Sequence, residues 1–219
     1  MRIDLINPQP GGVDAPVRET PVFQAIVFLK IALVAMLGWT PGIAHDTKSD
    51  SESSVIVNSV SEDAQCHFPD SALVTSSGKS VQFYEDLVKD KVVAINFIFT
   101  DCTTVCSPAA IKMSHLEQML KQRDASDVGL ISVSIDPVTD TPERLSEWSD
   151  RFNPGPDWTF LTGEKRTVDD LLRALKVFTP NYEDHQPIMI VANDATQSCR
   201  YVNGLSSAKF MLQAIDRIL

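Results

Sequence analysis

From about residue 64 onward, hydrophobic runs of strand length alternate with segments in which hydrophobic residues recur at helical spacing. The run at 91–99 is almost continuously hydrophobic, which is typical of a central strand. A second run lies at 129–135, and helical spacing recurs at 108–120, 141–152, 168–175 and 206–218. Strands and helices that alternate in this way pack as helices on a largely parallel sheet. The pattern predicts one α/β domain over residues 64–219, in which helices flank a central mixed sheet.

Shorter features complete the predicted domain. Residues 72–75 and 80–83 flank a turn-rich stretch and predict a hairpin, followed by a short helix at 84–88. Residues 158–161 predict a short edge strand, and 187–191 with 199–202 predict a closing strand pair. Pro108 fits the first turn of its helix. Thr141 and Thr167 are the expected N-caps of the two helices that follow.

The first 63 residues have a different character. Residues 1–21 are polar, residues 22–39 are hydrophobic except for Gln24 and Lys30, and residues 45–63 are predicted to be a flexible linker. Residues 22–44 fit a signal peptide that is cut before His45. They also fit a retained membrane anchor through 22–39, although Lys30 near mid-span would cost roughly 2.5–3.5 kcal/mol. Both interpretations predict an exported domain.

Charge narrows the classes of partner. The 219-residue chain has a formal net charge of -10 and no cluster of Lys and Arg. Nucleic-acid binding depends on clustered basic residues that neutralise phosphates. The composition therefore excludes a nucleic-acid binder. The hydrophobic content of 43% is sufficient for a folded core.

Two cysteines lie where the central strand ends and a helix is expected to begin. Cys102 and Cys106 are four residues apart, so on a helical turn their sulfurs face the same side. A helix N-terminus favours the thiolate, which is the nucleophilic and metal-binding form of cysteine. The pair is predicted to be a redox couple, a metal clamp or both, with a structural disulfide as the plainer alternative.

A strand, a thiol pair and then a helix is the order found in thioredoxin-like folds, here with three residues between the cysteines in place of two. His185 is the candidate third ligand. If the strand after it runs antiparallel to the central strand, its loop lies at the same sheet end as the thiols. Two thiolates and one imidazole suit copper. The plainer alternative is an ordinary loop histidine.

Three ordered motifs give the chain a specific resemblance. It is similar, over roughly residues 64–219, to the Sco/SenC family of copper-binding, thioredoxin-like proteins. The matching segments are Phe99-Thr100-Asp101-Cys102 with Cys106, Ser134-Ile135-Asp136-Pro137-Val138-Thr139-Asp140-Thr141-Pro142-Glu143, and Asp184-His185. The sequence departs from the usual family pattern in two places, because Ser107 separates Cys106 from Pro108 and Gln186 follows His185.

The resemblance implies a function and a location. It implies a copper ion held by Cys102, Cys106 and His185. It also implies a metallochaperone or thiol reductant that serves the CuA-bearing subunit of cytochrome c oxidase, with other copper chaperones or thiol reductants as further partners. The domain would then lie in the periplasm or face the outer side of an energy-transducing membrane. The alternative is a thiol–disulfide oxidoreductase in which the two cysteines react with partner cysteines and no metal is carried.

The remaining cysteines and acidic residues have simpler expected roles. Cys66 and Cys199 flank the domain, so a structural disulfide between them is expected, with free thiols or an extra metal contact as alternatives. Asp136, Asp140 and Glu143 resemble a catalytic carboxylate group. Turn formation, helix capping and placement near a helix N-terminus explain them more simply.

Overall fold

The computed structural model describes residues 61–64, 66–123 and 127–219, all of which belong to one compact unit, Ser51–Leu219. These residues form a sheet of eight strands in the order β1-β8-β7-β4-β5-β6-β2-β3. The strands are β1 (Ser61–Ala64), β2 (Ala72–Thr75), β3 (Ser80–Gln82), β4 (Val92–Ile98), β5 (Val128–Ser134), β6 (Trp158–Thr162), β7 (Ile188–Asn193) and β8 (Ser198–Asn203). The helices are α1 (Cys106–Gln122), α2 (Pro142–Ser149), α3 (Lys165–Ala174) and α4 (Ala208–Asp216), with shorter helical turns η1 (Phe83–Val88), η2 (Asp150–Phe152) and η3 (Tyr182–Asp184).

The sheet is mixed, as predicted, but among the described strands five pairings are antiparallel and two are parallel, so it is not the largely parallel sheet that the alternation of elements suggested. β4, β5 and β6 run parallel, and β7 runs antiparallel to β4. The carboxyl ends of β4 and β5 therefore lie at the same sheet edge as the start of β7. This edge receives both the cysteine loop, which follows β4, and the His185 loop, which precedes β7. The topology confirms the antiparallel pairing on which the prediction for His185 depended.

One strand was placed wrongly by sequence reasoning. Residues 158–161 were expected to form an edge strand, but β6 lies between β5 and β2. Four of its five residues pair with β5, and its last two pair with β2. The N-terminal hairpin of β2 and β3 covers its outer side, a long-range pairing that a local hydrophobic pattern does not reveal.

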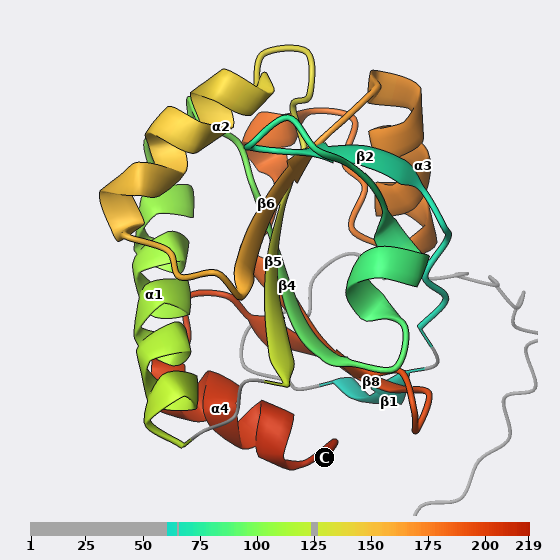
Figure 1. The fold of residues 1–219 in the computed structure, drawn as a ribbon, viewed down its shortest axis with the longest axis vertical. Helices are drawn as coiled ribbons and strands as arrows, with labels where there is room; N and C mark the ends of the chain where they lie inside the picture. The colour runs from blue at the N-terminus through green and yellow to red at the C-terminus, as the bar shows by residue number, and fades with distance from the viewer. Residues whose placement is uncertain (1–60, 65, 124–126) are drawn as a thin grey trace, which may run out of the picture. The chain divides into compact units, whose positions relative to one another are not determined.

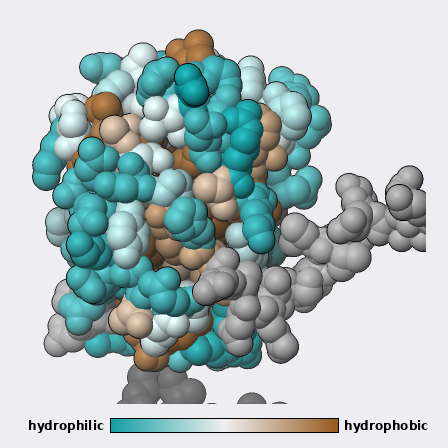
Figure 2. Space-filling view, turned by 90° about the vertical axis from the view of Figure 1, so that its right-hand side faces the viewer, coloured by the Kyte–Doolittle hydropathy of each residue, from teal (hydrophilic) through white to brown (hydrophobic). Residues whose placement is uncertain are grey.

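Helices cover both faces of the sheet. α1 and α4 pack together on one side, while α3 lies on the opposite side, as Figure 1 shows. α2 packs on β6, where the Trp148 ring lies 6.3 Å from the Phe160 ring between centroids. All seven residues of β4 are buried, which is the expected result for a central strand covered on both faces. The face that carries α3 is mostly hydrophilic at its surface, with some hydrophobic residues visible near its middle (Figure 2).

Helix boundaries followed the predicted signals in part. Thr141 is the N-cap of α2, and its hydroxyl accepts a hydrogen bond from the Arg144 amide at 3.4 Å. Thr167 is not the N-cap of α3, because that helix begins at Lys165 with Glu164 as N-cap. The Thr167 hydroxyl instead donates to the Glu164 carboxylate at 3.4 Å. It therefore supports the first turn from inside the helix.

A disulfide joins Cys66 to Cys199 across 133 residues, which confirms the predicted pairing. It ties the segment after β1 to β8, and β1 itself begins at Ser61 and pairs with β8. The predicted polar segment at 1–21, the predicted signal peptide or anchor at 22–44 and residues 45–60 of the predicted linker lie outside the described residues. The linker prediction is wrong for residues 61–63, which belong to β1. Within the described part of the chain, no helix has the length and hydrophobicity needed to cross a membrane.

Candidate metal centre

The two cysteines occupy the turn between β4 and α1. Cys102 lies in the loop and Cys106 is the first residue of α1. The Cys102 amide donates to the Phe99 carbonyl at 3.2 Å, which folds the loop back onto the end of β4. Both side chains are buried and carry free thiols, so the expected alternative of a structural disulfide between them is not what the structure contains.

The Cys102 sulfur completes the N-terminus of α1. The N-cap, Val105, provides no side-chain hydrogen bond, and the Cys106 amide donates to Cys102 Sγ at 3.3 Å. Burial opposes a thiolate at Cys102. The Cys106 thiol and the backbone amides of Thr104, Cys106 and Val105 together outweigh burial and lower the pKa of Cys102 below its ordinary value. The backbone amides at the predicted helix N-terminus thus stabilise the thiolate of Cys102.

Cys106 has the opposite electrostatic environment. Burial raises the pKa of the Cys106 thiol well above its ordinary value, and the hydrogen bond to Cys102 raises it further because it favours the protonated form. The two thiols therefore differ in character. Cys102 is the nucleophilic, readily ionised sulfur, and Cys106 keeps its proton until Cys102 reacts or a metal displaces it.

His185 lies at the same edge, directly after η3. Its side chain is 7% exposed, and among the described residues neither ring nitrogen has a hydrogen-bond partner. Burial lowers the pKa of His185, and the nearby Phe97 carbonyl partly opposes this without forming a hydrogen bond of normal geometry. The ring is therefore neutral near pH 7, which leaves a nitrogen lone pair available for a metal.

Phe99 connects the histidine loop with the thiol loop. Its ring lies edge-on to those of Tyr182 and His185, with centroids 5.2 and 6.5 Å away, and its carbonyl accepts from the Cys102 amide. The three predicted ligands thus gather around the end of β4. Within the described residues, however, no three His, Cys, Asp or Glu side chains are already grouped closely enough to hold a metal.

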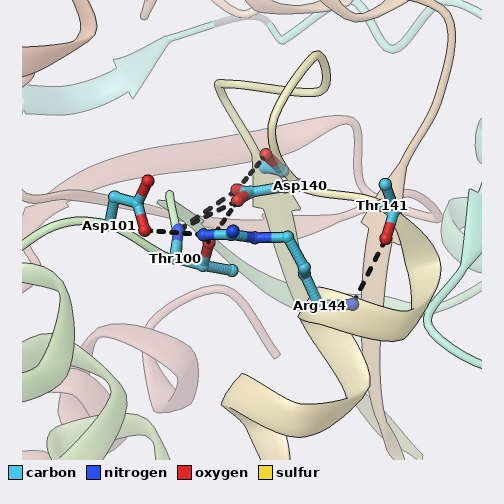
Figure 3. A network of polar contacts seen from close by, with 6 residues as sticks. Thr100, Asp101, Asp140, Thr141 and Arg144 are labelled. Carbon is cyan, nitrogen blue, oxygen red and sulfur yellow. Dashed lines mark hydrogen bonds and ion pairs between the residues drawn. The ribbon is translucent and has the colours of Figure 1, made fainter.

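A buried carboxylate, which the sequence analysis explained by turn formation, helix capping or placement near a helix N-terminus, supports the thiol loop. Asp140 is fully buried and accepts hydrogen bonds from the Thr100 amide, from the Thr100 hydroxyl at 2.5 Å and from the Ser134 hydroxyl at 2.6 Å (Figure 3). Burial raises the pKa of Asp140, and the hydroxyl donors oppose that shift. Its position between Ser134 and Thr141, after a hydrophobic strand, was the only sequence signal of this role.

Arg144 extends the same network to the residue before Cys102. Figure 3 shows its side chain reaching from α2 toward the loop, where it donates to the Thr100 hydroxyl at 3.1 Å and to the Asp101 carboxylate at 2.6 Å. Of the other acidic residues, Glu143 lies in the first turn of α2 as expected. The Asp136 carbonyl accepts from the amides of Thr139 and Asp140, which confirms the predicted turn.

The chain is similar in sequence to known proteins. The sequence model of the SCO1/SenC family matches residues 62–219. A relative from Bacillus subtilis (strain 168), described as an SCO1 protein homolog, is 30% identical over 141 residues. The match covers 61% of this chain and 72% of that relative.

Solved structures share the fold. A structure of BsSco, described as containing a disulfide switch and as a member of the Sco family of cytochrome c oxidase assembly proteins, has a TM-score of 0.62 and 25% identity. The alignment covers 73% of this chain and 96% of that one. The copper-bound crystal structure of Arabidopsis thaliana ScoI has a TM-score of 0.60 at 22% identity, covering 70% of this chain and 97% of that one.

Proposed function

The chain belongs to the SCO1/SenC family, and from this premise we propose that it binds copper through Cys102, Cys106 and His185 and acts in the assembly of cytochrome c oxidase. The observation that carries the proposal is a buried, neutral imidazole whose ring nitrogens have no hydrogen-bond partner within the described part of the chain, at the same sheet edge as a pair of free thiols. Copper is the cargo in this account. Its destination would be the CuA-bearing subunit of the oxidase.

The donor set suits copper better than hard cations. Thiolate sulfur is a soft ligand that favours Cu(I), and imidazole nitrogen is common to copper and zinc sites. Cys102 is already inclined to ionise, while Cys106 must release a proton when it ligates. Binding should therefore release protons and strengthen as pH rises.

His185 supports the proposal because its buried ring nitrogens have no hydrogen-bond partner among the described residues. A buried polar group without a hydrogen bond costs roughly 1–3 kcal/mol, so such groups commonly have a functional reason to persist. A bound metal would satisfy one ring nitrogen of His185. Because no three-ligand group is formed in the described residues, copper binding would require a closer approach of the sulfurs and His185. The place of His185 in a loop between η3 and β7 makes this approach feasible.

The asymmetry of the thiols favours a second function at the same site. Cys102 ionises more readily than Cys106, which is the usual difference between an attacking and a resolving cysteine. Cys102 thiolate would attack a partner disulfide to form a mixed disulfide and release one partner thiolate. Cys106 would then lose its proton and attack Cys102 Sγ, which releases the second partner thiolate and closes Cys102–Cys106.

The proposed location follows from the same role. We place the domain on the exported side of an energy-transducing membrane, held near it by residues 22–44 if that segment is retained. Export agrees with the Cys66–Cys199 disulfide, since disulfides persist in oxidising compartments. Separation of membrane-bound from released protein after cell fractionation tests whether the segment is kept.

The central experiment is a competition titration of the reduced protein with Cu(I), in which a chromogenic chelator of known affinity reports free copper. The proposal predicts tight one-to-one binding by the wild-type protein and weaker binding by His185→Ala. His115→Ala is the matched control, because His115 is an exposed histidine on α1. It should bind as the wild type does.

Two outcomes would contradict the proposal. One is the absence of tight one-to-one binding by the reduced wild-type protein. The other is an equal affinity in His185→Ala and His115→Ala, which would remove His185 from the ligand set. In the first case, a thiol exchange assay with a disulfide-containing peptide would test the second function directly. Activity retained by His185→Ala but lost in Cys102→Ser would support the oxidoreductase.

A further inference from the structure

We propose that Asp140 is a positioning residue for the thiol pair, which it holds in a convergent geometry through Thr100 and with the help of Arg144. The proposal rests on the function proposed above, since the pair that is positioned is the one that would hold copper. Neither Asp140 nor Thr100 belongs to the ligand set. Their proposed role is to fix the backbone that carries Cys102.

Several hydrogen bonds converge on the short segment before Cys102. Asp140 is buried and accepts from both the amide and the hydroxyl of Thr100, two residues before Cys102. The Ser134 hydroxyl, at the end of β5, donates to the same carboxylate. The loop is thus tied to the neighbouring strand by charge-assisted hydrogen bonds, which are stronger than neutral ones.

The hydrogen-bond network continues on the exposed side of the thiol loop. The Thr100 hydroxyl donates to Asp140 and accepts from Arg144, so it lies in a chain of hydrogen bonds between two charged groups. Arg144 also pairs with Asp101, the residue directly before Cys102. Both residues before Cys102 are held, one from the core and one from α2, as Figure 3 shows.

Fixing the thiol loop keeps the two sulfurs close to each other. With the loop held, the Cys106 amide lies 3.3 Å from Cys102 Sγ, so the start of α1 and the loop are already close together. A loosened loop would sample many more conformations in the dithiol state. Disulfide closure would then cost more entropy, and the same loss would weaken any metal held between the two sulfurs.

Thr100 offers the cleanest test because serine and valine separate its hydroxyl from its shape. Thr100→Val keeps the size of the side chain but removes the hydrogen bonds to Asp140 and from Arg144. Thr100→Ser keeps the hydroxyl. Asp140→Asn tests the carboxylate itself. Asp136→Asn is the matched control. It removes a carboxylate from the loop between β5 and α2 that also holds Asp140, and the Asp136 side chain takes no part in the network of Figure 3.

The measurement is the thiol–disulfide equilibrium of Cys102 and Cys106 in the full chain without copper, against reduced and oxidised dithiothreitol. On closure, the two thiols lose two protons and two electrons and form one S–S bond. Oxidised dithiothreitol takes up both protons and both electrons and becomes the dithiol. After acid quenching and alkylation, mass spectrometry of the peptide that contains both cysteines reports the two forms. Thermal unfolding of each variant monitors the fold.

Thr100→Val should lower the equilibrium constant for disulfide closure by about tenfold, the scale of one lost hydrogen bond. Asp140→Asn should shift it in the same direction, while Thr100→Ser and Asp136→Asn should stay within about twofold of the wild type, since neither loses a network hydrogen bond. If Asp140→Asn does not fold, the comparison of Thr100→Val with Thr100→Ser still tests the proposal. Equal constants for Thr100→Val and wild type, or equal shifts in Thr100→Val and Thr100→Ser, would overturn the proposal.

The copper titration is a separate readout. Thr100→Val should also weaken Cu(I) binding by about tenfold, as expected for residues that support metal ligands. If the wild-type protein binds no copper, the proposed function fails, but the redox comparison still tests the positioning role. If the wild-type protein binds copper and neither constant moves in Thr100→Val, the positioning role alone is wrong.

Discussion

The two loops that meet at the end of β4 are held in different ways. The thiol loop is tied by hydrogen bonds to a buried carboxylate and by an ion pair to α2. The His185 amide donates a hydrogen bond to the Tyr182 carbonyl, and the His185 ring contacts the Phe99 ring. Its ring nitrogens have no hydrogen-bond partner in the described residues. One side of the candidate site is fixed in advance, whereas the other is free to exchange its contacts when a ligand arrives.

This difference suggests a division of work. The fixed sulfurs would supply most of the affinity and all of the redox chemistry. The histidine would supply a third ligand that can be added or withdrawn at low cost. A protein that must pass on its cargo benefits from one weakly held ligand, because release then begins with a small conformational change.

The largest expected effect is a loss of Cu(I) affinity when a cysteine of the thiol loop is replaced. Cys102→Ser and Cys106→Ser should each weaken Cu(I) binding by more than about 100-fold, which exceeds the 10–100-fold typical of supporting residues. The reason is that one sulfur and one imidazole no longer form a soft, closed site. Chelator competition measures the affinity. A serine variant that binds within a few-fold of the wild type would contradict the claim that the sulfurs dominate.

A change far from both loops should affect stability and not binding. Cys199 lies on β8, which reaches β4 only through β7 and far from the end where β4 leads to the thiols. Replacing both Cys66 and Cys199 by serine should lower the free energy of unfolding by about 2–4 kcal/mol. Urea denaturation measures the loss, and Cu(I) affinity of the folded variant should be unchanged. A large loss of affinity would show that the two ends are coupled.

The smallest expected effect is a pH dependence of the free energy of unfolding that arises from His185. Burial lowers the pKa of His185, so the unfolded chain binds more protons at this residue than the folded protein does. The stability that neutral His185 contributes is therefore complete above pH about 6.5 and falls as pH drops toward its lowered pKa.

Urea denaturation of copper-free wild type and His185→Gln across pH 5–8 isolates this contribution. The stability difference between the two proteins should change toward acid pH in favour of the variant, because glutamine does not titrate. A difference that is independent of pH would mean that His185 is solvated and not buried as the structure has it.

Much of this site was accessible from the sequence, and the exceptions have physical causes. The common location of Cys102, Cys106 and His185 follows from the strand order. When β7 runs antiparallel to β4, the carboxyl end of β4 and the start of β7 lie at one edge of the sheet. The contacts of Asp140 were missed because turn formation, helix capping and placement near a helix N-terminus already explain an acidic residue just before a helix. Burial of its carboxylate against Thr100 depends on residues 40 positions apart, which no local pattern contains.

The interior position of β6 was missed for a related reason. Its pairing with β2 joins segments more than 80 residues apart, and neither segment carries a signal for the other. The Cys66–Cys199 pair was predicted correctly because cysteine count and compartment restrict the choices. Sequence reasoning thus succeeded where chemistry limits the alternatives and failed where a contact depends on tertiary packing alone.

The most direct test of the central claim is X-ray absorption at the copper edge of the Cu(I)-loaded protein and of its His185→Ala variant. The account predicts two sulfur ligands and one imidazole nitrogen in the wild type, with the imidazole scattering lost in the variant and both sulfurs retained. Identical spectra from the two proteins, or a wild-type spectrum without imidazole, would contradict it.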